Sequence, residues 1–110
     1  MKTSELLRAA QELIRDKSKW TRGAYGRDAA GESVDDVDSI TAAESFCALG
    51  AVHFVSGDEV DEGPWFEALR RAAIIAGESS VVSVNDVLGH DAVMKMFDRA
   101  IEIAEAEESQ

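Results

Sequence analysis

The stretch Ile40-Thr-Ala-Ala-Glu-Ser-Phe-Cys-Ala-Leu-Gly-Ala-Val-His-Phe-Val55 contains a single charged residue, Glu44. A helix that is apolar on nearly all sides usually lies at the centre of a domain. We therefore expect this stretch to form the buried central helix of the fold, beginning near residue 39 and ending at Gly57, because glycine commonly terminates helices. The rest of the chain is expected to pack around it.

Other elements follow from apolar periodicity and turn residues. Apolar side chains recur at helical spacing over about residues 3–17, 64–77 and 91–107. Residues 24–34 have the pattern of a short hairpin with Gly31 at the end of its turn, and Ser80-Val-Val-Ser-Val84 predicts a strand or an extended linker. The sequence thus predicts a mainly α fold: a single-domain bundle of about four helices, with a small β-hairpin and a short extra extended segment.

Length and composition set further limits. The 110 residues suffice for one hydrophobic core, so we expect a single globular domain over residues 1–110. The lone cysteine cannot form an internal disulfide and suits a reducing compartment, which predicts a cytoplasmic protein. No apolar run approaches the roughly 18 residues needed to span a bilayer, and the start of the chain does not have the pattern of a signal peptide. We expect no membrane association.

The charge is large and unevenly distributed. The net charge is −11. Residues 1–27 hold seven basic and three acidic side chains, a net of +4, so the remainder carries −15. Between Asp28 and Leu69 there are eleven carboxylates and no Lys or Arg. Such a field repels phosphate and attracts basic partners, which predicts a basic protein partner and no direct contact with nucleic acid.

Two acidic clusters are the first candidate site, a surface for a protein partner. Each cluster precedes a predicted helix, where acids interact favourably with the helix dipole. Neither has the spacing of a calcium loop, so no metal site is expected. They hold more charge than capping requires, which favours partner binding by Asp35, Asp36, Asp38, Asp58, Glu59, Asp61 and Glu62.

The acids at the chain's C-terminal end predict a contact between helices. Four glutamates lie in the last turns of the last helix, where the dipole disfavours negative charge: Glu102, Glu105, Glu107 and Glu108. The basic first segment can compensate them. We expect the first and last helices to be neighbours, with Arg8 or Arg15 opposite these glutamates.

Scattered polar side chains form the alternative candidate, a site for a small polar ligand or nucleotide. These residues are Trp20, Tyr25, Arg27, Asp28, Asn85, Asp86 and His90. The competing interpretation is local structure, because Asn and Asp bond their own backbone in turns and Asp91 is able to cap the last helix. If a polar site formed, His90 would lie beside Asp86 and Asp91.

Catalytic chemistry has weak support in the sequence. Cys47 lies in the most apolar stretch, where a thiol packs as a small hydrophobe and is inert. No phosphate loop, zinc spacing, G-x-S-x-G or kinase motif occurs. We expect no catalytic residue and no cofactor, with a small enzyme of unknown reaction as the last alternative.

Several short motifs carry a family resemblance. They are Trp20-Thr-Arg-Gly23, Gly26-Arg-Asp-Ala-Ala-Gly31, Cys47-Ala-Leu-Gly-Ala51, Asn85-Asp86 and Phe97-Asp-Arg-Ala-Ile101. The chain resembles an uncharacterised family of short bacterial and phage-borne proteins with W-T-x-G, A-R-D-x-x-G, C-A-L-G-A and N-D motifs. The family is a domain of unknown function, so the resemblance implies no activity.

Together these observations predict a non-enzymatic acidic interaction protein that binds a basic protein surface. Phage inhibitors of host nucleic-acid-handling or defence complexes, such as anti-CRISPR proteins, are an example of this class. A protein that binds or sequesters a small polar ligand or nucleotide is the alternative.

Overall fold

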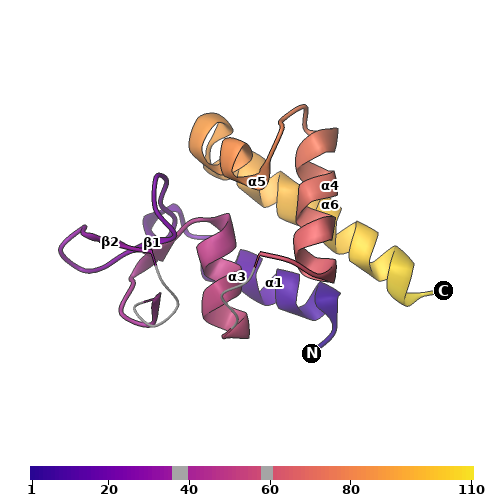
Figure 1. Cartoon of the computed structure of the whole chain (residues 1–110), viewed down its shortest axis with the longest axis horizontal. Coiled ribbons are helices and arrows are strands. Elements are labelled where there is room, and N and C mark those ends of the chain that lie inside the picture. The colour runs from indigo at the N-terminus through magenta and orange to yellow at the C-terminus, as the bar shows by residue number, and fades with distance from the viewer. Residues whose placement is uncertain (36–39, 58–60) are drawn as a thin grey trace.

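The computed structural model describes residues 1–35, 40–57 and 61–110. Within them the longer helices are α1 (Thr3–Leu13), α3 (Ala48–Ser56), α4 (Pro64–Ile75) and α6 (His90–Glu108). Shorter turns are the 3-10 helix η1 (Lys17–Lys19), the helical turn α5 (Val81–Ser83) and the π-helical turn η2 (Val84–Leu88). Figure 1 shows a small sheet at one end of the molecule and the C-terminal end of α6 at the other. The predicted mainly helical fold with a small antiparallel sheet is confirmed.

Amphipathic helices build the core. α1 packs against both α3 and α6, and α4 packs against α6. The largest fully buried apolar side chains are Leu7, Ile14, Val52, Leu69, Val84, Val93, Met96 and Phe97. They come from α1 and its C-terminal cap, and from α3, α4, η2 and α6. The hydrophobic core therefore joins the N-terminal and C-terminal helices directly. None of the described helices is both long and apolar enough to cross a membrane.

The predicted hairpin is present and gains a third strand. β1 (Gly26–Arg27) pairs antiparallel with β2 (Ser33–Val34), with Gly26 opposite Val34. In the turn, Asp28 Oδ1 accepts hydrogen bonds from the backbone N–H of Ala30 at 2.9 Å and of Glu32 at 3.0 Å. β3 (Ser45–Phe46) pairs with the other edge of β1 and was not predicted.

The central helix begins later than predicted. The part of the expected helix before Cys47 is not an extension of α3, because Phe46 pairs with Gly26 and its carbonyl accepts a hydrogen bond from Thr21 N at 3.0 Å. Cys47 itself has extended backbone angles and caps α3, its Sγ accepting from Gly50 N at 3.3 Å. Non-local strand pairing has therefore replaced the first turns of the predicted helix.

Two other predictions were wrong: the type of structure at residues 80–84 and the end of the first helix. The segment at residues 80–84 is helical rather than extended, because the Ser80 hydroxyl caps it by accepting from Ser83 N at 3.0 Å. Val81 and Val84, three residues apart, then face the core together. The first helix ends at Leu13 instead of residue 17, and a separate turn follows in which Asp16 Oδ1 accepts from Ser18 N.

The predicted contact between the first and last helices is confirmed. Arg8 pairs with Glu105 at 2.7 Å, and the Ser4 hydroxyl donates to Glu108 at 2.6 Å. The hydrogen bonds from Ser4 lower the pKa of Glu108. Arg15, just beyond the end of α1, instead pairs with Glu12. The Arg8–Glu105 and Arg15–Glu12 ion pairs are solvent-exposed, so each contributes only about 0–1 kcal/mol.

Among the glycines, Gly50 permits the closest approach of another segment. α3 passes so near the segment before β1 that a Cβ at Gly50 would overlap the carbonyl oxygen of Tyr25. The same oxygen accepts a hydrogen bond from Cys47 N at 3.0 Å. The missing side chain therefore lets the start of α3 dock on the sheet.

We predict that Gly50→Ala destabilises the protein. Without the contact, alanine in a helix would be favoured over glycine by about 0.5–1 kcal/mol, so the sign of the change is diagnostic. Overpacking against a backbone oxygen costs about 1–3 kcal/mol and should give a net loss in urea unfolding. Lys95→Ala, at an exposed position of α6, is the control and should change the unfolding free energy by less than about 0.5 kcal/mol. A gain in stability for Gly50→Ala would contradict the close approach.

Candidate functional site

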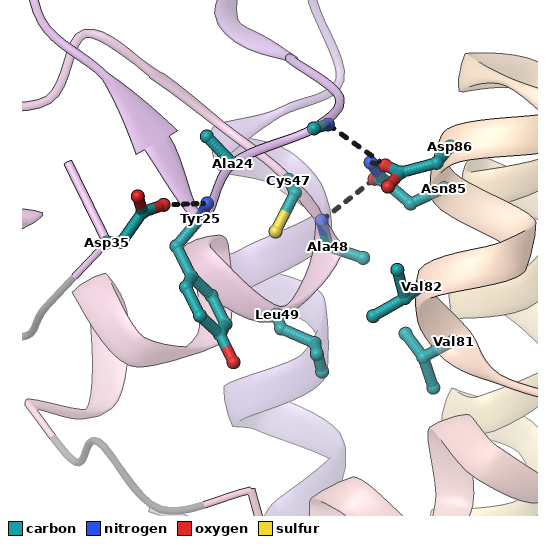
Figure 2. A pocket seen from close by; sticks show the side chains of 11 residues that line it. Ala24, Tyr25, Asp35, Cys47, Ala48, Leu49, Val81, Val82, Asn85 and Asp86 are labelled. Carbon is teal, nitrogen blue, oxygen red and sulfur yellow. Dashed lines mark hydrogen bonds between the residues drawn. The ribbon is translucent and has the colours of Figure 1, made fainter. Parts of the chain in front are cut away.

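A cavity of about 250 Å³ lies between the start of α3, the segment before β1, and the α5–η2 turns. Its floor is formed by buried residues: Cys47, Ala48, Leu49, Val81 and Asn85. More exposed residues form its rim: Gly23, Ala24, Tyr25, Asp35, Val82 and Asp86. Figure 2 shows the Cys47 sulfur and Tyr25 on one side, facing the two valines and Asp86 on the other. Segments far apart in the sequence thus enclose one space.

Asn85 joins these segments through every hydrogen-bonding position of its side chain. Its Oδ1 accepts from Trp20 Nε1 at 2.8 Å and from Ala48 N at 3.0 Å. Its Nδ2 donates to Thr21 O at 3.1 Å and to Asp86 Oδ1 at 2.9 Å. The residue is only 2% exposed. A buried amide with all four bonds made fixes its neighbours strongly, because losing any bond leaves a buried polar group unpaired.

The π-helical turn η2 places Asn85 and Asp86 side by side. Gly89 N donates to Val84 O at 3.1 Å, which closes the wide turn, and Gly89 adopts a φ of 102° that favours glycine. Asp86 Oδ1 also accepts from Gly23 N at 3.1 Å, so both residues of the pair hold the loop that follows Trp20. The π-helical turn therefore positions Asn85 and Asp86 to bond residues 20–23, more than 60 residues earlier in the chain.

The Arg22 guanidinium and the His90 imidazole both contact the Trp20 ring. The Arg22 guanidinium lies over the Trp20 ring at 5.0 Å and donates to Asp86 O at 3.2 Å. His90 meets the same ring edge-on at 5.6 Å, and its Nε2 lies 2.8 Å from Ile14 O. Both contacts hold the indole in place. His90 does not line the cavity.

A second polar cluster supports the opposite wall. Tyr25 OH donates to Asp61 Oδ2 at 3.1 Å, and Asp61 Oδ1 lies 2.6 Å from His53 Nε2. Tyr25 stacks on His53 at 5.1 Å between ring centroids. Burial and the Asp61 carboxylate raise the pKa of Tyr25 to about 12. The phenol therefore stays protonated and oriented, with its ring fixed at the rim.

The structure divides the predicted ligand-binding residues into three groups. Tyr25, Asn85 and Asp86 line the cavity, whereas Trp20 and His90 pack behind Asn85. Arg27 and Asp28 are used in the hairpin: Arg27 donates to Thr21 Oγ1 at 3.0 Å and to Gly31 O at 3.2 Å, and Asp28 stabilises the turn. The structure does not bring these last two side chains to the cavity.

The predicted acidic surface is described only in part. Asp36, Asp38, Asp58 and Glu59 lie outside the described residues. Asp35 is at the cavity rim, with Oδ1 accepting from Tyr25 N at 3.3 Å. Asp61 is bonded to Tyr25 and His53, and Glu62 is exposed. Asp35 and Asp61, from the two clusters, therefore meet at Tyr25, which the sequence did not predict.

Cys47 is buried, as predicted, but in a different role. Its side chain is 8% exposed at the cavity floor, and it caps α3 rather than lying within the helix. Burial raises the pKa of the thiol to about 11, although N–H groups of Gly50 and Leu49 partly oppose this. The floor residues Leu49 and Val81 and the rim residue Val82 were not predicted as site residues, because nothing local in their patterns distinguishes them from other valines and leucines of the helices.

A family model matches most of the chain. The model described as "Family of unknown function (DUF6197)" matches residues 1–103. The chain belongs to this family. No match was found among curated proteins or among solved structures. Within residues 1–35, 40–57 and 61–110, no group of three or more His, Cys, Asp or Glu side chains is placed to hold a metal ion. Membership in a family of unknown function therefore assigns no activity.

We predict that Cys47 reacts slowly with thiol reagents in the native protein. Its raised pKa leaves almost no thiolate near neutral pH, and burial blocks access. Labelling should accelerate as the pH rises toward 11, and should become fast in urea. The Cys47→Ser variant is the unlabelled control, and its buried hydroxyl should cost roughly 1–3 kcal/mol. Stoichiometric native labelling at the unfolded rate would refute the prediction.

We also predict that Asn85→Asp destabilises the protein by at least about 1–3 kcal/mol in urea unfolding, as expected when buried groups lose their partners. The new oxygen would face Thr21 O and Asp86 Oδ1, which now accept from Nδ2. Val87→Ala, on the same turn and 70% exposed, is the matched control. Equal stability of Asn85→Asp and the wild type would show that the amide does not hold these segments together.

Proposed function

We propose that this protein is a non-enzymatic interaction protein that binds a basic protein partner. One observation carries the proposal: two carboxylates, Asp35 and Asp86, stand at the rim of the cavity, and no Lys or Arg is among the described residues that line it. Arg22, which precedes Gly23 of the rim, is held on Trp20 and on the Asp86 carbonyl. The rim therefore offers anionic groups to a cationic partner.

The overall charge supports the same class of partner. At a net charge of −11, the protein repels nucleic acid and attracts basic surfaces over a Debye length of about 10 Å at 0.1 M salt. Asp36, Asp38, Asp58, Glu59 and Glu62 add to the acidic segments that contain Asp35 and Asp61. Steering of this kind raises association rates and depends strongly on salt.

In its finer form, the proposal places the partner among host nucleic-acid-handling or defence complexes. Proteins that bind nucleic acid expose Lys and Arg to contact phosphates, so an acidic protein that covers such a surface would block it. An anti-CRISPR-like inhibitor carried by a phage or a bacterium and acting in the cytoplasm is the form we favour. The single cysteine, kept reduced and buried, suits that compartment.

Binding of a small polar ligand is the second candidate, favoured by Tyr25, Asn85 and Asp86 lining one cavity. A nucleotide fits poorly, because its phosphates would meet the carboxylates of Asp35 and Asp86. A reaction at Cys47 is also poorly supported, since the thiol is protonated at neutral pH. These features favour a binding role over catalysis.

We predict that neutralising the acidic segments slows association with the partner. The test variant combines five changes: Asp35→Asn, Asp36→Asn, Asp58→Asn, Glu59→Gln and Glu62→Gln. Asp61 is left intact because it bonds Tyr25 and His53. A partner captured from host lysate and purified should associate at least about tenfold more slowly with this variant at low salt, and the difference should shrink at 1 M salt.

A matched control removes the same charge elsewhere. Its changes are at exposed positions of α1 and α6: Glu12→Gln, Asp91→Asn, Glu102→Gln, Glu105→Gln and Glu107→Gln. The control should retain most of the association rate. Unchanged rate and affinity in the test variant, with loss of binding in Asn85→Ala, would replace the acidic-surface proposal by the small-ligand candidate.

A further inference from the structure

The cavity has an apolar floor beneath its acidic rim. Ala48, Leu49 and Val81 are at most 4% exposed and supply aliphatic surface, and the neutral Cys47 thiol lies among them. Figure 2 shows these side chains facing one space, with Asp35 and Asp86 on opposite sides of it. The chemistry of the site therefore changes with depth, from charged at the rim to apolar at the floor.

The polar side chains at the floor are already satisfied by the protein. Asn85 makes all four of its hydrogen bonds to Trp20, Thr21, Ala48 and Asp86. Cys47 Sγ accepts from Gly50 N. A polar ligand group inserted to the floor would lose its hydration without gaining a partner, which is costly. An apolar group would instead exchange water for aliphatic contacts.

The size of the cavity suits one side chain. At about 250 Å³ it is smaller than the roughly 300–1,000 Å³ of pockets that enclose drug-sized ligands. A nucleotide or other large cofactor would exceed it. A single aliphatic side chain entering a pocket of this kind is a typical anchor of a protein interface.

The rim retains hydrogen-bonding capacity for a cation. Protein donors reach Oδ1 of Asp86, from Gly23 N and Asn85 Nδ2, and Oδ1 of Asp35, from Tyr25 N. Within the described part of the chain, Oδ2 of each carboxylate has no protein partner. Lysine or arginine side chains next to an inserted apolar residue would lie at the right depth to meet these oxygens.

The surroundings of the mouth favour a macromolecule over a free metabolite. Val82 at the rim is 51% exposed, and Val87 and Leu88, on the adjoining η2 turn, are 70% and 47% exposed. Exposed apolar groups close to one another are typical of surfaces that contact another protein. They extend the apolar contact beyond the cavity itself.

We infer that the cavity binds an apolar side chain of the partner that is flanked by Lys or Arg. The apolar side chain fills the floor against Leu49 and Val81, and the flanking cations pair with Asp35 and Asp86. This inference rests on the proposed function, because it names the recognition element of the same basic partner. It adds that charge alone is insufficient: the partner must also supply an aliphatic anchor.

The test uses three synthetic peptides, each with blocked ends. The first is Gly-Lys-Lys-Leu-Lys-Lys-Gly, the second has Ser in place of Leu, and the third has Glu in place of each Lys. Binding is followed by NMR at the methyl groups of Val81 and Val82, with the exposed Ile74 of α4 as the remote control. The leucine peptide should bind roughly tenfold or more tightly than the serine peptide, because burying a leucine is worth that much. The glutamate peptide should not bind.

Two protein variants separate the contribution of apolar contact from that of charge. Val82→Ser removes apolar wall and should reduce the preference for leucine over serine. Asp35→Asn combined with Asp86→Asn keeps the Oδ1 acceptors and should weaken both lysine peptides by up to about fivefold per carboxylate, while the preference for leucine remains. Glu102→Gln combined with Glu107→Gln is the control of equal charge on α6 and should leave the peptides' affinity and the methyl shifts unchanged.

The outcomes distinguish this inference from the proposed function. Equal binding of leucine and serine peptides, both weakened by the Asp35 and Asp86 changes, would overturn the apolar anchor and leave the basic partner in place. Absence of methyl shifts at Val81 and Val82 while the purified partner still binds would also overturn it. Binding of isobutylammonium as tight as that of the leucine peptide would assign the cavity to a small amine and overturn it as well. Loss of partner binding only in the acidic-segment variant tests the proposed function separately.

Discussion

The side-chain amide of Asn85 is the interaction on which the rest of the site depends. It connects the N-terminus of α3, through Ala48 N, to the segment after η1, through Trp20 and Thr21. These contacts span 37 to 65 residues of sequence. Because the group is buried, each bond is difficult to exchange for water, and the three segments must move together or not at all. The cavity is the space that remains between segments held at this separation.

The same constraint explains why the polar motifs of the sequence are more numerous than a helical core needs. Asp86 orients Asn85 and holds the Gly23 loop, Arg22 covers Trp20, and Arg27 binds carbonyls of the neighbouring loops. Gly50 allows α3 to approach Tyr25 closely. These residues build a frame, whereas the groups available to a partner are the second oxygens of two carboxylates and the aliphatic floor. The chemistry of recognition is thus separate from the chemistry that shapes the site.

Sequence patterns predicted what depends on local periodicity. α4 and α6 appear close to their expected positions because each has one apolar face, and Pro64 begins α4 as expected. The excess of glutamate at the end of α6 predicted its contact with α1, because the helix dipole disfavours negative charge there and basic side chains of the first segment compensate it. In contrast, residues before Cys47 are apolar enough for a helix but are used in pairing with β1, a contact that no local pattern reveals. Similarly, the valine-rich residues 81–84 are helical because the Ser80 hydroxyl caps them by accepting a hydrogen bond from Ser83 N.

The candidate site was predicted only as separate pieces. Tyr25, Asn85 and Asp86 were among the predicted ligand-binding residues, but Leu49 and Val81 look like any core residues. Cys47 was correctly expected to be buried, although from a mid-helix position that it does not occupy. Distances between three separate segments decide the cavity, and these come from the packing of the whole fold.

Native-state hydrogen exchange tests most directly whether Asn85 holds the segments as one unit. The two protons to follow are the indole N–H of Trp20 and the backbone N–H of Ala48, which share Asn85 Oδ1 as acceptor. Our account predicts that both exchange only with the free energy of global unfolding, as the amides of α6 do. Exchange of both protons at the rate of exposed loops, while α1 and α6 remain protected, would contradict it.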